Sequence, residues 1–198
     1  VPLFDNDRPT VVYAPHCRRS LSSWDRFGQD VIAWFSAQDR YNLVVAPHVR
    51  LFADAPQSAR DAITALAIPG KVMIDLDSDR LFDMSYMIGA DIYLGDVSSQ
   101  VYEFLAIPRP CLFLNAHGVQ WQGDADYLFW TLGDVLDDLS DLQQALDRAA
   151  TRHPHYIDAQ RQRLAESVGG DPTGAARRGA DAIAAFLEND GPAGKSEI

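Results

Sequence analysis

Short, uninterrupted runs of apolar residues alternate with segments of helical character along this chain. The runs are rich in β-branched residues and stop at Pro, Gly or Asp, which is typical of strands buried on both faces. We expect six strands, at residues 10–15, 41–48, 71–76, 90–96, 110–115 and 127–133. Apolar spacings of three and four predict helices over 22–38, 58–67, 80–89, 98–107, 138–150, 156–167 and 173–187. The alternation predicts an α/β fold, a doubly wound parallel sheet with helices on both faces.

Three segments are expected along the chain. Residues 1–9 are polar, contain two prolines and are expected to form a lead-in linker. Residues 10–187 hold all the predicted strands and helices and are expected to form a single domain. Residues 188–198 contain Gly, Pro and Lys and are expected to form a flexible tail. Because the first residue is Val rather than Met, we also expect a trimmed or partial chain.

The charge of the chain restricts its partners. The formal net charge is -11, which opposes binding to nucleic acid or to an anionic membrane surface, so no nucleic-acid partner is expected. An anionic small ligand needs a locally positive site. The two cysteines, Cys17 and Cys111, are too few for a disulfide scaffold and lack the spacing of a metal site. We expect reduced thiols and a cytoplasmic protein, and peripheral attachment at the inner face of a membrane is left open.

Polar side chains gather directly after the predicted strands. They are His16, Arg18 and Arg19 after the first, His48 and Arg50 after the second, Asp96, Ser98 and Ser99 after the fourth, and His117 after the fifth. The carboxyl ends of parallel strands meet at one edge of a sheet, which is where ligands bind in open α/β folds. We therefore expect these imidazoles, guanidinium groups and hydroxyls to lie around one ligand.

The stretch LGDVSSQVYEF, residues 94–104, places two serines where a strand ends and a helix begins. Helix N-termini carry free N–H groups and a positive dipole end, so they bind anions, and Ser98 and Ser99 add hydroxyl donors. The arginines after the first two strands add charge-assisted bonds. Asp96 repels phosphate and is expected to orient a loop or cap the helix. Glu103, one turn further on, is placed to accept hydrogen bonds from a ribose.

Each of these features also has a purely structural interpretation. Ser98 and Ser99 are favoured helix caps, histidines after strands are often structural, and paired arginines are often solvated. Asp75 and Asp77 are interpreted as turn residues, because the stretch DLDSD lacks the rest of a calcium loop, and no metal site is expected. Dinucleotide, Walker and nucleophile-elbow motifs are absent from the sequence. The convergence of several signals on one sheet edge favours the functional interpretation.

Three stretches resemble the C-terminal half of GT-B-fold transferases: VVYAPHCRRSLSSW, LVVAPH and ADIYLGDVSSQVYEFLAIPRPCLFLN. They are most similar to the CDP-glycerol glycerophosphotransferase family, which builds teichoic-acid and capsule polymers. That family carries a Tyr-Ala-Pro step, a strand ending in Pro-His, an Asp-x-Ser-Ser step, and a Pro-led strand after a turn like Arg109-Pro110. The likeness covers about residues 10–150. This chain departs from the family at Val97, where Tyr is more usual, and at His16, where Thr is frequent.

The resemblance implies a Rossmann-like, donor-binding domain of the GT-B C-terminal type. His16 and His48 are then the catalytic residues. The residues assigned to donor binding are Arg18, Arg19, Asp96, Ser98, Ser99, Gln100, Glu103 and His117. The implied substrates are a CDP- or UDP-linked donor and an acceptor polymer or glycan, with no obligatory cofactor. An N-terminal half-domain would be missing, so the isolated domain is expected to be inactive. A UDP-sugar 2-epimerase-like enzyme and a non-catalytic transferase-like module remain alternatives.

Overall fold

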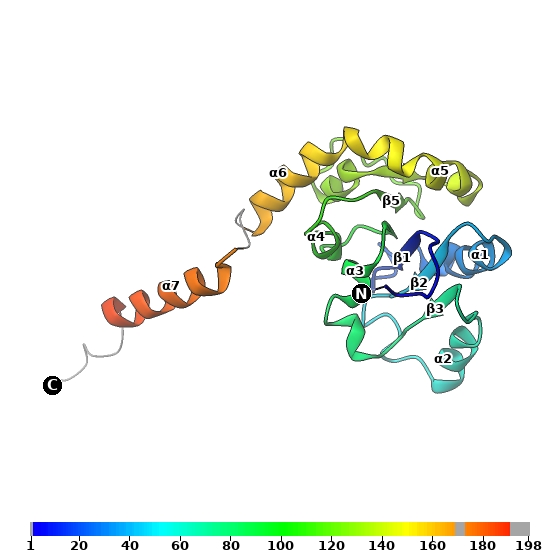
Figure 1. The fold of residues 1–198 in the computed structure, drawn as a ribbon, viewed down its shortest axis with the longest axis horizontal. Coiled ribbons are helices and arrows are strands. Elements are labelled where there is room, and N and C mark those ends of the chain that lie inside the picture. The colour runs from blue at the N-terminus through cyan, green and yellow to red at the C-terminus, as the bar shows by residue number, and fades with distance from the viewer. Residues whose placement is uncertain (1, 169–172, 191–198) are drawn as a thin grey trace. The chain divides into compact units, whose positions relative to one another are not determined.

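The computed structural model describes residues 2–168 and 173–190, in which helices and strands alternate (Figure 1). In this part of the chain, six strands form one sheet in the order β3-β2-β1-β4-β5-β6. The strands are β1 (Thr10–Ala14), β2 (Asn42–Val45), β3 (Val72–Ile74), β4 (Ile92–Gly95), β5 (Cys111–Leu114) and β6 (Asp134–Leu136). Every neighbouring pair is parallel. The predicted doubly wound α/β fold is therefore confirmed.

The α-helices of the described residues are α1 (Trp24–Ala37), α2 (Gln57–Thr64), α3 (Ser85–Gly89), α4 (Gln100–Phe104), α5 (Leu142–Arg152), α6 (Ile157–Val168) and α7 (Ala175–Asp190). The 3-10 helices are η1 (Asp79–Leu81), η2 (Ala125–Leu132), η3 (Leu139–Asp141) and η4 (His153–His155). The chain divides into two compact units, residues 1–161 and 162–198, and the sheet belongs to the first. No helix of the described residues is long and apolar enough to cross a membrane.

The strand expected at 127–133 is wrong, because this segment belongs to η2. Its side chains do not alternate between two faces, because the neighbouring residues Phe129 and Trp130 pack against the same cluster of buried side chains. The sixth strand begins only after Gly133, whose Cα lies so close to the Cys111 carbonyl that a Cβ would be 2.1 Å from the oxygen. The chain can enter the sheet edge here because the residue is glycine.

Two expected helices are shorter than predicted. The helix over 80–89 is split into η1 and α3, because Met84 adopts a left-handed conformation with φ 63°. The helix over 98–107 is reduced to α4, which ends at Phe104. The guanidinium of Arg109 donates a hydrogen bond to the Phe104 carbonyl and so satisfies one of the acceptors left at that helix end.

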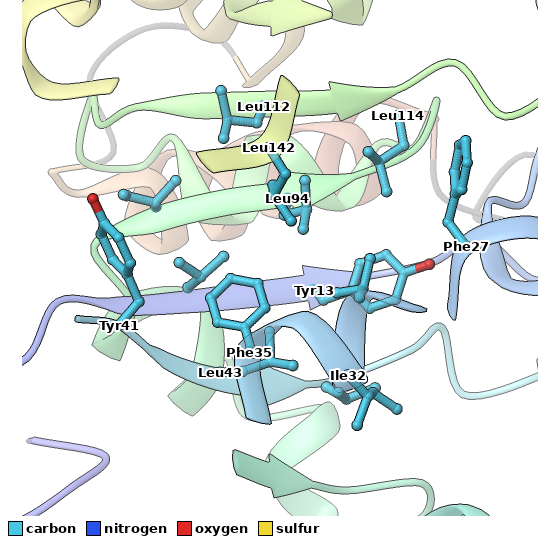
Figure 2. Close-up of a cluster of buried hydrophobic side chains, with 14 of the residues drawn as sticks. Tyr13, Phe27, Ile32, Phe35, Tyr41, Leu43, Leu94, Leu112, Leu114 and Leu142 are labelled. Atoms are coloured by element: carbon cyan, nitrogen blue, oxygen red, sulfur yellow. The ribbon is translucent and has the colours of Figure 1, made fainter. Parts of the chain in front are cut away.

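The core lies on both faces of the sheet, as the continuous apolar strands predict. Along β1, Val11 and Tyr13 face one cluster of buried side chains, while Val12 and Ala14 face the other. Figure 2 shows the first cluster, in which strand side chains pack against α1 and α5; its labelled members include Tyr13, Phe27, Ile32, Phe35, Leu43, Leu94, Leu112 and Leu142. The second cluster contains Phe104 from α4 and side chains of α3 and η2.

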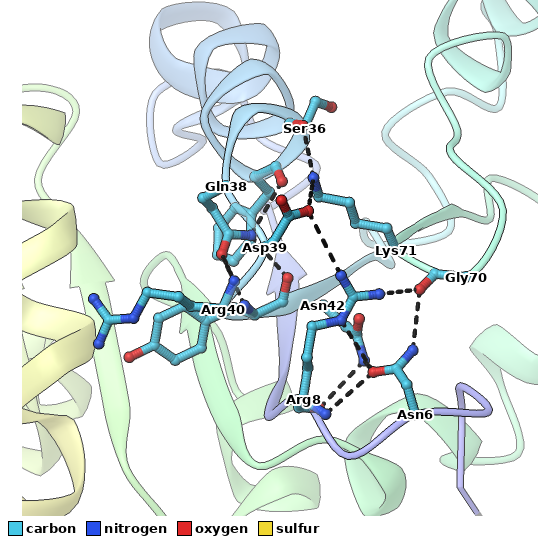
Figure 3. A network of polar contacts seen from close by, with 11 residues as sticks. Asn6, Arg8, Ser36, Gln38, Asp39, Arg40, Asn42, Gly70 and Lys71 are labelled. Atoms are coloured by element: carbon cyan, nitrogen blue, oxygen red, sulfur yellow. Dashed lines mark hydrogen bonds and ion pairs between the residues drawn. The ribbon is translucent and has the colours of Figure 1, made fainter.

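The lead-in segment is anchored at the edge where the strands begin (Figure 3). Phe4 is buried with 8% of its surface exposed. Asn6 accepts hydrogen bonds from the Asn42 side chain at 2.9 Å and from the Arg8 backbone at 3.1 Å. The segment expected as a linker is thus packed against β2. Within the expected tail, α7 continues to Asp190, and residues 191–198 lie outside the described part.

Candidate functional site

The order of strands places a topological switch point between β1 and β4. From β1 the chain builds β2 and β3 on one side, and from β4 it builds β5 and β6 on the other. Ligands of open α/β sheets bind beyond the strand ends at such a point. His16 follows β1, and Ser98 follows β4, so both predicted site residues flank the switch point.

A hollow of about 300 Å³ lies at these strand ends. The predicted site residues that line it are His16, His48, Ser98, Ser99, Gln100 and Glu103. Val49, Leu81 and Phe82 complete its lining. A larger hollow of about 470 Å³, lined by residues 3–6, 67–70 and 72–74, contains one carboxylate and no imidazole or hydroxyl. The smaller hollow is therefore the candidate site, because it collects chemically capable side chains from three strand ends.

The two histidines occupy equivalent positions on neighbouring strands. Tyr13 of β1 lies opposite Val45 of β2, and each histidine follows its strand residue by three positions. The ring centroids of His16 and His48 are 5.9 Å apart. Burial lowers the pKa of both imidazoles, with further lowering at His16 from His48 and Arg18. Both rings are therefore mainly neutral near pH 7.

Asp96 holds the loop after β1 rather than lining the hollow. Its carboxylate is completely buried and accepts hydrogen bonds from the backbone N–H groups of His16 at 2.8 Å and Ser23 at 2.9 Å. Burial raises the pKa of Asp96 to about 6, although these hydrogen bonds oppose the rise. The structure thus places Asp96 where the sequence predicts a loop-orienting residue, and the assignment to direct donor contact does not match its position.

The two serines differ in their surroundings. Ser98 is buried, and its Oγ accepts a hydrogen bond from the Gln100 backbone N–H at 3.3 Å, so it acts as a cap of the turn that opens α4. Ser99 precedes α4, makes no capping bond through its side chain and is exposed. Both line the hollow. The cap interpretation therefore describes Ser98 in part, while the Ser99 hydroxyl faces solvent.

Gln100 and Glu103 contribute an amide and a carboxylate from α4. The Oε1 atom of Gln100 is buried and has no hydrogen-bond partner among the described residues. The same side chain lines a small adjoining cavity together with Arg80. Desolvation raises the pKa of Glu103. α4 thus presents one amide and one carboxylate to the hollow.

Besides Asp96, three predicted donor-binding residues lie away from the hollow's lining. Arg18 and Arg19 are exposed, and Arg19 lies 3.7 Å from the Asp25 carboxylate. His117 Nε2 is 3.1 Å from the backbone oxygen of Ser22, which ties the loop after β5 to the loop after β1. The structure does not bring these three side chains into the candidate site. Arg18 acts on it through its charge, which lowers the pKa of His16.

Phe82 lines the hollow and was not predicted from the sequence. Its side chain is 68% exposed, a large fraction for an aromatic residue, and it follows Leu81, which also lines the hollow. The expected helix over 80–89 includes both residues, and its apolar face would be buried. The sequence feature that points to Phe82 as a site residue is the Leu-Phe pair directly after the acidic turn that follows β3.

The acidic turn after β3 is structural, as predicted. The Asp75 carboxylate accepts hydrogen bonds from the Ser78 backbone at 2.9 Å and the Tyr86 hydroxyl at 2.6 Å. Burial alone raises the pKa of Asp75, but these hydrogen bonds outweigh it and lower the pKa. Asp77 forms an ion pair with Arg60. In the described part of the chain, no cluster of three or more His, Cys, Asp or Glu residues is placed to hold a metal ion.

No protein-family model matches this sequence, and no curated protein matches it significantly. Among solved structures, the wall teichoic acid polymerase TagF matches 95% of this chain and 45% of its own, with 15% identity and a TM-score of 0.63. S. aureus MnaA bound to UDP matches 92% and 47%, at 15% identity and a TM-score of 0.53. The calicheamicin glycosyltransferase CalG4 matches 94% and 45%, at 18% identity and 0.54. At such identities these likenesses establish the fold. The chain spans less than half the length of each of these structures.

Proposed function

We propose that this chain is the donor-nucleotide-binding domain of a GT-B transferase. It would bind a nucleotide-diphosphate donor and present the transferred group to a hydroxyl acceptor. The observation that carries the proposal is the convergence of two imidazoles, two serine hydroxyls and an amide around one hollow at the switch point. TagF, a wall teichoic acid polymerase, supports a role in cell-surface polymer synthesis, and UDP-bound MnaA supports a nucleotide ligand. Both cysteines are free thiols, in keeping with the proposed cytoplasmic location.

The donor is proposed to lie across the hollow from the strand ends toward Phe82. Its phosphates would contact His16 and His48 together with the two serines, because these side chains donate hydrogen bonds to oxyanions. The ribose would lie near Glu103, which accepts hydrogen bonds from hydroxyls. The exposed ring of Phe82 offers a flat apolar face for the base.

In the proposed reaction, the acceptor oxygen forms a bond to the transferred group as that group's bond to the departing nucleotide breaks. The electron pair of the broken bond remains on a phosphate oxygen of the nucleotide. Fixed donors aimed at that oxygen stabilise the developing charge, which is the main catalytic contribution available to this hollow. No cofactor is obligatory in this proposal. A second, N-terminal domain would supply the acceptor site and the base that takes the proton of the acceptor hydroxyl, so this chain alone would bind the donor without turnover.

Calorimetry on the full chain with CDP, UDP, GDP and ADP tests the proposal. We expect binding of at least one diphosphate, and we expect the double variant Ser98→Ala, Ser99→Ala to abolish it. Ser58→Ala, an exposed position in α2, is the matched control and should bind as the unaltered chain does. Unchanged affinity in the double variant would reduce both serines to helix caps.

A nucleotide-sugar 2-epimerase-like enzyme is the second candidate function. The likeness to UDP-bound MnaA supports a UDP-linked ligand, and Glu103 in the hollow offers an acidic group that an epimerase would need. Incubation with UDP-N-acetylglucosamine and analysis of the products separates the two, because an epimerase needs no acceptor. If no nucleotide raises the melting temperature of the chain, the third candidate, a non-catalytic binding module, is favoured instead.

A further inference from the structure

The loops after β1 and β2 hold their histidines in the same way. Each loop contains an Ala-Pro-His step with an arginine two residues after the histidine. The backbone N–H of Arg18 donates to His16 Nδ1 at 2.9 Å, and that of Arg50 donates to His48 Nδ1 at 3.2 Å. A backbone amide can only donate, so each Nδ1 must carry its lone pair. In a neutral imidazole, the proton is then on Nε2.

Further backbone bonds fix both loops in place. The His16 N–H donates to the buried Asp96 carboxylate, and the His48 N–H donates to the Pro15 carbonyl at 3.0 Å. If Nδ1 carried the proton, its N–H and the backbone N–H of the arginine would face each other as two donors, and the backbone N–H would lose its acceptor. Both bonds lie in solvent-exposed parts of the loops, so water can partly replace a lost partner, and each bond contributes a preference rather than a full desolvation penalty. The geometry of the loops therefore favours one tautomer at both positions.

We propose that the two loops lock His16 and His48 as a pair of Nε2–H donors that clamp phosphate oxygens, and that neither ring is the general base of the reaction. This inference rests on the proposed function. Since Nδ1 is turned to the loop backbone and both rings line the hollow, Nε2 is the nitrogen left to a ligand. A general base needs a lone pair on that same atom. The proton acceptor for the incoming hydroxyl must therefore lie elsewhere.

Burial and the charges around the pair keep both rings neutral. Burial is the largest cause of the lowered pKa at both histidines, and Arg18 and Arg50 each lower further the pKa of the histidine in their own loop. Glu103 shares the hollow, and the carboxylate of Asp96 is engaged by the loop backbone. A second proton on either ring would go to Nδ1 and break the bond from the arginine N–H. Acid is thus expected to loosen the loops rather than to strengthen the clamp.

Long-range ¹H–¹⁵N correlation spectra of the full chain, labelled at histidine and recorded at pH 7.5, test the locked tautomer directly. Spectra of His16→Asn and His48→Asn assign the two signals. We expect both rings to show a protonated Nε2 and an unprotonated Nδ1, with and without inorganic pyrophosphate. An Nδ1–H pattern or an averaged mixture at either ring overturns the inference.

The same two variants test the clamp. Asn places an oxygen where the Nδ1 acceptor was, so it keeps the loop bond while removing the Nε2 donor. We expect unchanged melting temperatures and about tenfold to hundredfold weaker binding of inorganic pyrophosphate for each variant. Equal affinity in variant and unaltered chain overturns the clamp. Pyrophosphate binding with Nδ1–H rings overturns this inference alone, whereas the absence of both pyrophosphate and nucleotide binding overturns the proposed function with it.

Discussion

Arg109 closes the carboxyl ends of two helices that position the candidate site. Its guanidinium donates to the carbonyls of Met87 at 2.8 Å and Ile88 at 3.0 Å, and also to those of Ala90 and Phe104. It lies 3.9 Å from the centroid of the Phe104 ring. Burial lowers the pKa of Arg109, although the group stays charged at neutral pH. One cation thus serves the carbonyls of α3, of α4 and of the turns that follow them.

Arg109→Met removes these donors and keeps most of the apolar stem. The bonds to Met87, Ala90 and Phe104 are partly buried, and at about 1 kcal/mol each they amount to about 3 kcal/mol. The lost cation–π contact adds roughly 0.5–1 kcal/mol. We therefore expect a loss of about 3–4 kcal/mol, a large part of the roughly 5–15 kcal/mol that stabilises a typical domain. The melting temperature should fall by about 10 °C.

Urea unfolding followed by tryptophan fluorescence measures this loss. Arg109→Lys, which keeps the charge with fewer donors in a different geometry, should fall between Met and the unaltered chain. Arg148→Met is the control, because the side chain of exposed Arg148 forms hydrogen bonds only with Gln144 among the described residues. Nucleotide affinity should also fall in Arg109→Met, since α4 carries Gln100 and Glu103. A loss below about 0.5 kcal/mol, equal to that of the control, would falsify the idea that Arg109 holds the two helices.

Three further predictions follow from single side chains. Phe82→Ala should weaken nucleoside diphosphate binding about tenfold and leave inorganic pyrophosphate unaffected, because only the base would stack on the ring; equal losses for both ligands in calorimetry would contradict this. Asp96 has a folded-state pKa raised from 3.8 to about 6, so it is protonated more readily in the folded chain, and stability should fall by roughly 3 kcal/mol as pH rises from about 4 to 6. Asp96→Asn should flatten that part of a stability profile measured by urea unfolding, and an unchanged slope would exclude Asp96 as its source. Gln160 is 1% exposed and donates to the Leu132 carbonyl at 2.8 Å, so Gln160→Leu should cost about 2–3 kcal/mol in thermal unfolding, and an unchanged melting temperature would contradict this.

The strands were predictable where burial on both faces imposes a continuous apolar run. β1 to β5 all lie within the segments expected for them. β6 was missed because an edge strand is short and partly exposed: Asp134 opens it and bonds to Arg152 and Tyr156. The aromatic segment before β6 is apolar enough to be predicted as a strand, yet it packs as the 3-10 helix η2. A local pattern does not distinguish these two uses of apolar residues.

The convergence of the site was predictable because parallel strands end at a common edge. His16, His48 and Ser98 reach one hollow for that reason alone. Orientation within the loops was less predictable, because exposed cations such as Arg19 are directed by solvation and by nearby carboxylates. The tautomers of the two rings depend on backbone contacts over two residues, which no residue pattern specifies.

The separation between the two imidazoles is inherited from the sheet. β1 and β2 run in register, and neighbouring strands in any sheet lie about 4.8 Å apart. The ring centroids, 5.9 Å apart at the rim, are about 1 Å further apart than the strands themselves. Loop mutations can change what the rings contact, whereas the distance between the starts of the two loops follows the spacing of the strands in the buried core. The length of ligand that both rings can contact therefore depends mainly on the sheet. Substitutions that change specificity should act at the residues around the hollow other than the two histidines.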